Sequence, residues 1–370
     1  MTLDLDNHRS DGPLKRSGGE PSATDFEPFH AGKNILVTGA GGSIGSALAQ
    51  TLSAFSPRTL VLLDSSEQNL FHTHTRLSGL PGVDKLVPVL GSIADERCVR
   101  DVFERFQPEI VYHSAALKHV PLMEMNPFAV VQNNLFGTVT LATAARRFAA
   151  NRMVMISTDK AVNPQSMMGA SKRLAEVALL VLGDDATRMS SIRMGNVIAS
   201  EGSVIPLFLE QIKRGGPVTV THSDVERYFM SMEETVGCIL RAAASDHRGG
   251  GICIPVMGEP IKIVDLARQL IEQSSAHGIS IQYTGLRPGD KLHEEFVSDR
   301  ESLLPDPTDG LYWIDSPHLA EPELVHGIAE LSLAVEERNL TKLLATMTRL
   351  VEEYQPSEYL RQQVAMAAAT

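Results

Sequence analysis

The stretch "NILVTGAGGSIGSALAQ", Asn34 to Gln50, decides the fold of this chain. An apolar run typical of a buried strand comes first, a glycine turn follows, and a helix-like segment completes the stretch. The glycines have GxxGxxG spacing, which permits a tight turn, close approach of the backbone to a pyrophosphate, and close helix–sheet contact. The order of strand, turn and helix therefore predicts a dinucleotide site. The cofactor-binding residues predicted in this turn are Gly39, Gly42, Ser43, Ile44 and Gly45.

Short apolar runs and amphipathic segments alternate onward from this stretch. This alternation predicts an α/β fold with a doubly wound parallel sheet covered by helices on both faces. The expected strands are Ile35–Val37, Thr59–Leu63, Leu86–Leu90, Ile110–His113, Met153–Ser157 and Ser190–Met194. The expected helices of this region are Ser43–Phe55, Glu96–Phe106, Phe128–Ala149 and Ser171–Leu182.

The rhythm of the sequence divides the chain into four parts. Residues 1–31 are polar and aperiodic and are expected to form a flexible extension. Residues 32–195 are the predicted Rossmann domain for the dinucleotide. Residues 196–300 are expected to form a smaller mixed α/β part, some of whose segments return to the first sheet, and residues 301–370 a helical tail.

Composition limits the possible functions. The net charge of −12 over 370 residues leaves no basic face for a nucleic acid or an anionic membrane. The three cysteines lack CxxC spacing, and the histidines lack metal-ligand spacing, so we expect reduced thiols and no metal. Without a signal-peptide pattern or an apolar run of roughly 18 residues, we expect a soluble cytoplasmic protein.

The strand after the glycine turn ends in Asp64, about where an acidic residue meets the adenosine ribose of a dinucleotide. A carboxylate there accepts hydrogen bonds from the ribose hydroxyls and repels a 2′-phosphate, so NAD is favoured over NADP. An ordinary strand-end aspartate is the alternative interpretation. Residues at the neighbouring strand ends complete the predicted cofactor contacts: Ser65, Ser92, Ile93, Ala115 and Ala116.

Groups that exchange protons follow the fifth expected strand, in "MVMISTDKAVNPQSMMGASKRLAE". Thr158, Asp159 and Lys160 lie at the strand end, and Lys172 follows on a helix-like segment. A hydroxyl, a carboxyl and an amine in succession suit proton transfer. The alternative is that Asp159 caps a turn while Lys160 is a solvated cation.

Several long motifs in order make the chain resemble the extended short-chain dehydrogenase/reductase superfamily. They are the glycine turn, "HSAALKHVPLMEMNP", "NNLFGT", "STDKAVNP…MGASK", "RMGNVIASEGSVIPLF", "GGPVTVTHSDVERYFMSMEE", "MGEPIKIVDLA" and "GLRPGDKLHEEF". The resemblance covers about Lys33 to Phe296 and is closest to the nucleotide-sugar 4,6-dehydratases of polysaccharide biosynthesis. Within these it is similar to the configuration-retaining group that acts on UDP-N-acetylglucosamine, in a form without the membrane segments of the larger members.

The resemblance implies a reaction and assigns roles. Hydride leaves C4 of the sugar for NAD, water is eliminated across C5 and C6, and the hydride returns to C6. Asp159 is implied as the acid for the leaving hydroxyl and Lys160 as the C5 base, so we expect a protonated aspartate and a neutral lysine. Thr158 is implied to hydrogen-bond O4 or relay its proton. Lys172 is implied to bind the nicotinamide ribose, and Asn133 to fix backbone near the cofactor.

Met168 departs from the superfamily pattern, which has a tyrosine four residues before the lysine. Methionine has no proton to exchange, so deprotonation of O4 must pass through Thr158, water or a neighbour. Some of the 4,6-dehydratases that the chain resembles also have methionine here. We therefore read Met168 as the mark of a subgroup within the catalytic set, although simple pocket filling explains its packing equally well.

The resemblance also implies residues for the nucleotide sugar. Arg227 and Arg287 are candidates for the diphosphate, because guanidinium pairs well with phosphate oxygens. Asp290 and His293 stand where the relatives usually show Glu and Tyr, which leaves details of the nucleoside pocket open. The other substrate-binding residues implied are Lys118, His119, Asn196, Ser203, Val204 and Glu294.

Other functions stay open at this point. A C5-inverting 4,6-dehydratase fits the same motifs, and a UDP-sugar C4 epimerase needs only the base at O4. A non-catalytic NAD-binding regulatory protein is the alternative from a different class, and the missing tyrosine is its best argument. The superfamily implies a homo-oligomer, a dimer or larger, built on helices such as Phe128–Ala149 and Ser171–Leu182. The pathway and the preferred hexose are not determined by the sequence.

Overall fold

The computed structural model describes residues 23–80, 85–198, 200, 202–247, 250–274, 278–304 and 310–368. Most of the predicted N-terminal extension, up to residue 22, lies outside them. Its last part differs from the expectation of a flexible segment, because the chain is helical in η2 (Ala23–Phe26) and α1 (Glu27–His30). His30 is fully buried there and hydrogen-bonds the hydroxyl of Tyr112 in the sheet at 2.6 Å.

The core of the molecule is a nine-stranded sheet of order β14-β15-β11-β6-β5-β4-β1-β2-β3. Its first seven strands in chain order run parallel. At one edge β15 pairs antiparallel with β11, and β14 pairs antiparallel with β15. The doubly wound α/β prediction is confirmed. The strands are β1 (Asn34–Thr38), β2 (Thr59–Asp64), β3 (Leu86–Leu90), β4 (Ile110–His113), β5 (Arg152–Thr158), β6 (Arg188–Met194), β11 (Gly250–Pro255), β14 (Ser302–Leu303) and β15 (Leu311–Asp315).

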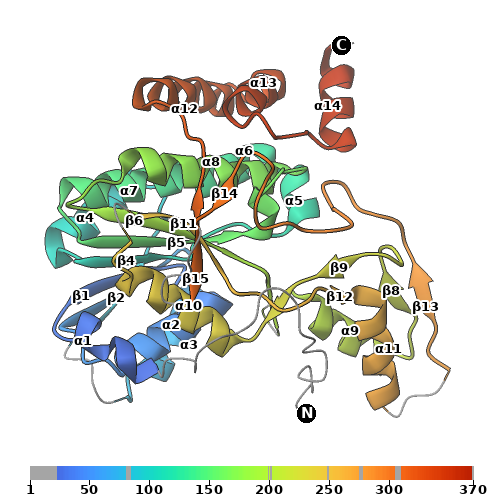
Figure 1. Ribbon diagram of the computed structural model, residues 1–370, viewed down its shortest axis with the longest axis horizontal. Helices are drawn as coiled ribbons and strands as arrows, with labels where there is room; N and C mark the ends of the chain where they lie inside the picture. Colours follow the sequence, from blue (N-terminus) through green and yellow to red (C-terminus); the bar gives the residue numbers. More distant parts are fainter. Residues whose placement is uncertain are drawn as a thin grey trace.

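Helices cover both faces of this sheet, as Figure 1 shows. Side chains alternate along β1: Ile35 and Val37 belong to the apolar core of one face, and Leu36 to that of the other. The first face carries α2 (Ser43–Ser53), α3 (Glu67–Leu77) and α10 (Met232–Ala244). The second carries α4 (Glu96–Phe106), α5 (Val120–Glu124), α6 (Pro127–Val130), η3 (Val131–Phe136), α7 (Gly137–Arg147) and α8 (Met167–Leu182).

Two predicted helices differ from the structure in a way that concerns the site. The expected helix Phe128–Ala149 is three elements, because the backbone widens into a π-helical turn, η3, between α6 and α7. The helix expected from Ser171 begins four residues earlier, since the Ser166 hydroxyl accepts the backbone N–H of Gly169 at 3.1 Å. Met168 and Lys172 therefore lie on the same helix, α8.

A smaller lobe follows β6 and has an apolar core of its own, with Phe208 and Leu266 fully buried. Figure 1 shows it beside the sheet at the lower right. Its elements are β7 (Asn196–Val197), α9 (Val204–Lys213), β8 (Val218–Val220), β9 (Glu226–Arg227), β10 (Phe229–Met230), β12 (Ile261–Lys262), α11 (Ile263–Gln273) and β13 (Ile281–Tyr283). β11, β14 and β15 return from this part of the chain to the large sheet.

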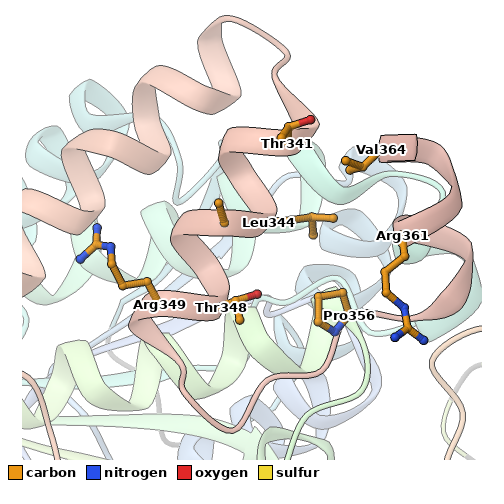
Figure 2. A pocket seen from close by; sticks show the side chains of 8 residues that line it. Thr341, Leu344, Thr348, Arg349, Pro356, Arg361 and Val364 are labelled. Carbon is orange, nitrogen blue, oxygen red and sulfur yellow. The ribbon is translucent and has the colours of Figure 1, made fainter. Parts of the chain in front are cut away.

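The C-terminal helices form an additional layer outside the second face of the sheet (Figure 1). They are α12 (Glu321–Glu336), α13 (Leu340–Leu350) and α14 (Glu358–Ala368). Leu331 of α12 and Met347 of α13 are fully buried in one apolar cluster with Val131 and Leu174, which lie in η3 and α8. A cavity of 550 Å³ lies between α13 and α14 and is lined by Leu344 and Val364 among others (Figure 2). Within the described ranges, no helix is long and apolar enough to cross a membrane.

Candidate active site

The glycine turn lies where the carboxyl ends of β1 and β4 meet. β1 has β2 on one side and β4 on the other, so this is the point at which the strand order reverses and an open sheet leaves a crevice for a ligand. Gly39 has φ +64°, and a Cβ on it would lie 2.6 Å from the backbone nitrogen of Ala115. A Cβ on Gly45 would overlap the Gly39 carbonyl oxygen. Both positions thus require glycine for the close approach of the chain to itself.

The amino end of α2 suits a pyrophosphate. Its N-cap is Gly42, which has no side chain to cap the first turn. Uncapped N–H groups at a helix start bind anions, and the turn has no side chain that would fill the approach. The residues present therefore fit a dinucleotide, with Ser43 and Ile44 in the first turn as predicted.

Asp64 at the end of β2 orders the glycine turn. One carboxylate oxygen accepts the N–H of Gly41 and the other that of Ser66, each at 2.8 Å. The ordinary structural role that the sequence left open is therefore present in the structure. A carboxylate has further lone pairs, so the ribose assignment stays a prediction. Ser65, beside it, is exposed.

The other predicted cofactor residues line the neighbouring strand ends. Ile93 is buried against Gly137, where a Cβ would lie 2.6 Å from its side chain, and Ser92 accepts the N–H of Ala94 at 3.2 Å. Ala115 is half-buried and Ala116 exposed at the end of β4.

Asn133, predicted to fix backbone, donates a 3.0 Å hydrogen bond to its neighbour Asn134, and it is Asn134 that binds backbone. The Asn134 amide accepts the N–H of Leu117 at 2.8 Å and donates to its carbonyl at 2.9 Å. Asn134 thereby holds the segment that follows β4. Sequence reasoning missed it because adjacent asparagines offer no sign of which one faces inward.

The proton-exchanging triplet forms one connected unit at the end of β5. The Thr158 hydroxyl donates to Asp159 Oδ1 at 2.9 Å, and the Lys160 ammonium donates to the same oxygen at 2.7 Å. Asp159 is fully buried, and its second oxygen, Oδ2, has no hydrogen-bond partner among the described residues. A buried carboxylate oxygen without a partner is costly, so it marks a position for a ligand donor.

Glu294 and Arg227 join this unit from the smaller lobe. Glu294 Oε1 lies 3.7 Å from the Lys160 ammonium and 3.6 Å from an Arg227 guanidinium nitrogen. The Glu294 side chain is 2% exposed, and its Oε2 also has no partner among the described residues. Two carboxylates and two cations are thus gathered at one end of the sheet.

The protonation of Lys160 differs from the neutral state that the resemblance implied. Burial works to lower the pKa of Lys160, but the nearby Asp159 and Glu294 carboxylates outweigh it, so the pKa is raised and the ammonium is favoured. Burial raises the pKa of Glu294, with Lys160 acting against it. In the absence of substrate, the Lys160 side chain is therefore held as a cation between two carboxyl groups.

Lys172 and Met168 lie on α8, the helix that follows the triplet in the chain. Burial lowers the pKa of Lys172 to about 8, with Glu176 acting against it. Burial, and then the Lys172 charge, lowers the pKa of His113 to about 3, so this histidine is neutral between Thr38 and Thr138. Met168 is 3% exposed and belongs to the apolar cluster of α8 and η3. Its placement among the catalytic residues stays a prediction.

A network of buried ion pairs contacts the end of β5 through Ser157. Ser157 donates a 2.6 Å hydrogen bond to Glu176, which pairs with Arg193 through both carboxylate oxygens, at 3.0 and 2.8 Å. Arg193 pairs in turn with Glu301 at 2.8 Å, and the guanidinium lowers the pKa of that carboxyl, against burial, to about 2. Arg173 joins Glu301 at 3.3 Å. Sequence reasoning missed this network, since its members come from four distant segments.

The loop after Lys160 is held in place by several contacts. A Cβ on Gly169 would overlap the Lys160 carbonyl oxygen, so glycine allows α8 to pack directly on this loop. The buried Lys291 ammonium donates to the Val162 carbonyl at 2.6 Å, and Pro164 accepts the N–H of Gln355 at 2.9 Å. Of these contacts, the sequence gives a sign of the first only, through the glycine of the "MGASK" motif.

The predicted sugar-nucleotide residues lie on facing loops. Gly202 has φ +70°, and its Cβ position is 3.1 Å from His119 Nε2, which places the segment with Lys118 and His119 against the start of α9. Ser203 is the N-cap of α9, its hydroxyl oxygen has no partner among the described residues, and Val204 follows it. Asn196 donates its backbone N–H to the Tyr228 carbonyl at 2.8 Å.

The two arginines predicted for the diphosphate have different surroundings. The guanidinium of Arg227 donates to the carbonyls of Glu226, Leu292 and Lys291 at 2.7, 3.1 and 2.8 Å. Arg287 is 59% exposed and pairs with Asp290 at 2.8 Å, beside a 420 Å³ cavity. Among the described residues, no hydrogen bond or ion pair joins Arg287 to the triplet, so the structure brings Arg227 but not Arg287 to the proton-exchanging unit. Among the described residues, no cluster of side chains has the composition of a metal site.

Known proteins resemble this chain in sequence and in fold. A family model described as "Polysaccharide biosynthesis protein" matches residues 35–315. The capsular polysaccharide biosynthesis protein CapD of Staphylococcus aureus is 46% identical over 274 residues, which are 73% of this chain and 46% of that protein. This chain therefore spans about half the length of that relative.

Other relatives are matched over most of their length. The UDP-N-acetylglucosamine 4,6-dehydratase (inverting) of Campylobacter jejuni is 32% identical, over 74% of this chain and 80% of that protein. The UDP-glucose 4-epimerase of Rickettsia typhi is 30% identical, over 76% of this chain and 82% of that protein. Among solved structures, Pen from Bacillus thuringiensis superposes with a TM-score of 0.70 at 30% identity, covering 79% of this chain and 92% of that one.

Proposed function

The chain belongs to the polysaccharide biosynthesis protein family, and from that premise we propose that it is an NAD-dependent nucleotide-sugar 4,6-dehydratase. Its proposed substrate is UDP-N-acetylglucosamine, and its proposed product is UDP-2-acetamido-2,6-dideoxy-hexos-4-ulose with the C5 configuration retained. Relatives with named activities include both a dehydratase and an epimerase, so the choice between these reactions rests on the residues of the site.

One observation carries the proposal: the fully buried Asp159 accepts from the hydroxyl of Thr158 and the ammonium of Lys160, and its second oxygen has no partner in the part of the chain that the structure describes. Removal of water across C5 and C6 needs an acid for the C6 hydroxyl as well as a base for the C5 proton. A C4 epimerase needs neither. A buried acid beside an amine is therefore expected of a dehydratase and has no use in an epimerase or a regulatory protein.

The cofactor would be held by the glycine turn, the uncapped start of α2, and Asp64. Asp64 at the ribose position favours NAD over NADP, since a carboxylate repels a 2′-phosphate. When bound, NAD would accept a hydride from C4 of the sugar and return it to C6. Lys172, with its lowered pKa of about 8, would bind the nicotinamide ribose and place a positive charge near O4.

The proton movements use the triplet in turn. Thr158 accepts the O4 proton while passing its own to Asp159, because its hydroxyl already points at that carboxylate. Lys160 takes the C5 proton, and Asp159 gives its new proton to the C6 hydroxyl, which leaves as water. Lys160 then returns its proton to C5. Removal and return by one amine on one face of the ring retains the C5 configuration.

The anionic part of the substrate would lie between the smaller lobe and the sheet. The start of α9 has no side-chain cap, and the Ser203 hydroxyl oxygen next to it is without a partner among the described residues. Free N–H groups at a helix start favour a diphosphate. Asn196, Val204, Lys118 and His119 would surround the sugar nucleotide from the same side.

The test is incubation of the purified chain and NAD with UDP-N-acetylglucosamine in D₂O, followed by NMR of the product. The proposal expects loss of one water, deuterium at C5 and retained configuration. Inverted C5 configuration would select the inverting reaction, the activity named for the Campylobacter relative. A C4 epimer without loss of water would select the epimerase, and no turnover of UDP-hexoses with intact NAD binding would favour a regulatory protein.

The acid assignment has its own variant. Asp159→Asn keeps the shape of the side chain but cannot donate a carboxyl proton, so dehydration should fall by about 10² or more. Cofactor binding should stay unchanged. Asp299→Asn, on an exposed residue, is the matched control. Unchanged turnover in Asp159→Asn would refute the assignment.

A further inference from the structure

The proposed reaction requires a neutral Lys160, yet the structure holds this side chain as an ammonium. Asp159 Oδ1 lies 2.7 Å and Glu294 Oε1 3.7 Å from its nitrogen. A cation cannot take the C5 proton. The ammonium proton must therefore leave Lys160 before the elimination and come back afterwards. The Lys160 side chain is 23% exposed, and a carboxylate beside it offers a nearer acceptor than solvent.

Asp159 is not available as this acceptor. In the proposed reaction it receives the O4 proton through Thr158 and must keep it for the departing C6 hydroxyl. Once Asp159 is neutral, it no longer holds the Lys160 cation. The one carboxylate left beside Lys160 among the described residues is Glu294, whose side chain is 2% exposed and whose Oε2 lacks a partner.

We propose that Glu294 stores the ammonium proton of Lys160 while Lys160 acts as the C5 base. Glu294 acts through Lys160 and does not touch the reacting atoms, so it is a positioning residue. The inference rests on the proposed dehydratase function. It adds Glu294 to the proton transfers proposed there for Thr158, Asp159 and Lys160. Burial raises the pKa of Glu294, which favours uptake of a proton by this carboxylate.

The protons balance over one turnover. At the start Asp159 and Glu294 are ionised and Lys160 is charged. The O4 proton passes to Asp159, and the Lys160 proton passes to Glu294. Lys160 takes the C5 proton, Asp159 releases its proton to the leaving water, and Lys160 gives the C5 proton back. Glu294 then returns the stored proton to Lys160, and all groups are in their first state.

The distances and charges of the surroundings suit such a transfer. The Lys160–Glu294 separation is roughly 0.7 Å longer than an ordinary hydrogen bond, so a small side-chain movement closes it. The charged or titratable groups that face the pair from other elements are Arg227, Lys291 and Tyr228. Arg227, at 3.6 Å, keeps Glu294 ionised until Lys160 delivers its proton.

The first test needs no substrate. Trace acetylation with acetic anhydride, followed by mass spectrometry of the Lys160 peptide, gives the titration of this amine from pH 6 upward. In Glu294→Gln one of the two neighbouring negative charges is gone. The pKa of Lys160 should then fall by about one unit or more. Glu295→Gln removes an exposed carboxylate one residue away and should leave the titration unchanged.

The second test is the pH dependence of kcat for the dehydration. With internal storage, kcat of the unaltered chain should be flat between about pH 6 and 8. Glu294→Gln must release the Lys160 proton to solvent, so its kcat should be at least about tenfold lower at pH 7. It should then rise about tenfold per pH unit until Lys160 has titrated.

Further variants separate this role from a structural one. Glu294→Asp keeps the carboxylate and should restore the flat profile, whereas a residue that only packs would not be rescued. Thermal unfolding of Glu294→Gln checks that weakening its contact with Arg227 has not unfolded the protein. Either an unshifted Lys160 titration or a flat pH profile in Glu294→Gln overturns the proposal. If the unaltered chain dehydrates no UDP-sugar, the proposed function fails, while the acetylation result still shows whether Glu294 controls the Lys160 proton.

Discussion

The Thr158 hydroxyl and the Lys160 ammonium donate to one and the same oxygen, Asp159 Oδ1, at 2.9 and 2.7 Å. A single carboxylate oxygen thus joins the group nearest to O4 in the proposed reaction to the proposed C5 base. Thr158 also accepts the N–H of Lys160 at 3.4 Å, which fixes the hydroxyl with its proton directed at Asp159. In the proposed reaction, Thr158 and Asp159 would take the place of the proton acceptor that the chain lacks at Met168.

Replacement of Thr158 tests this relay. Thr158→Val keeps the branched shape but removes the hydroxyl, so turnover should fall by about 10² because O4 loses its path to Asp159. Thr158→Ser keeps the hydroxyl and should stay within a few-fold of the unaltered chain. Product formation by NMR measures both. Equal activity of the valine and serine variants would exclude the relay.

Met168→Leu should leave turnover nearly unchanged. Met168 is buried in an apolar cluster, and leucine conserves both its volume and its lack of an exchangeable proton, so the cost in stability should be below about 1.5 kcal/mol. Turnover and urea unfolding are the measurements. A large loss of turnover with intact stability would show that the thioether itself takes part.

The glycine turn allows a comparison within one motif. Gly45→Ala places a Cβ onto the Gly39 carbonyl, so stability should fall by about 1–3 kcal/mol. Gly42→Ala meets the same carbonyl oxygen at 3.3 Å, and the destabilisation should be clearly smaller. Both are followed by urea unfolding without cofactor. Similar losses in the two variants would contradict the packing that the structure assigns to Gly45.

The buried ion network makes a prediction about stability. Glu176→Gln leaves Arg193 with half of its carboxylate partners in a site with no solvent access, and such losses cost about 3–5 kcal/mol. Glu210→Gln breaks an exposed pair with Arg214 and should cost about 1 kcal/mol or less. The two free energies of unfolding are compared at pH 7. A small effect at Glu176 would show that Glu301 alone satisfies Arg193.

His30 links stability to pH. Burial lowers its pKa to about 4, against a small opposing effect of its hydrogen bond to Phe26, while the unfolded chain titrates near 6.5. The folded state therefore loses stability as the pH falls from 6.5 towards 4. His30→Gln removes this dependence, so its destabilisation relative to the unaltered chain should be about 2 kcal/mol smaller at pH 5 than at pH 7. A difference that does not change with pH would mean that folding does not lower the pKa of His30.

Much of the site was predictable because its residues are local. Each strand end of the Rossmann part carries its functional group within a few residues of an apolar run, as with Gly39 after β1 and Asp159 after β5. The continuous apolar run of β1, whose side chains point alternately to the two faces, likewise predicts a parallel sheet covered by helices on both faces. These features depend on short-range periodicity and turn chemistry.

The remainder depends on contacts between distant segments, which one sequence does not reveal. The position of Glu294 beside Lys160 is set by the return of the chain from the smaller lobe. The expectation of a lowered pKa for Lys160 rested on burial, but the Asp159 and Glu294 carboxylates outweigh burial and raise the pKa, and the expectation omitted the second of them. The π-helical turn of η3 breaks a regular apolar pattern and contains no proline or glycine among its residues Val131–Phe136, although Gly137 follows directly.

The position of α12 and α13 over α8 and η3 bears on assembly. Helices of the second face were expected to be the dimer surface, but here α8 and η3 bury their apolar side chains against the same chain's own Leu331 and Met347. The chain thus supplies from its own sequence the cover that a second subunit would otherwise provide there. A homo-oligomer that forms with these helices in place would leave the covered side chains of α8 and η3 out of its interface, and the arrangement of its active sites relative to one another would follow from the surface used instead.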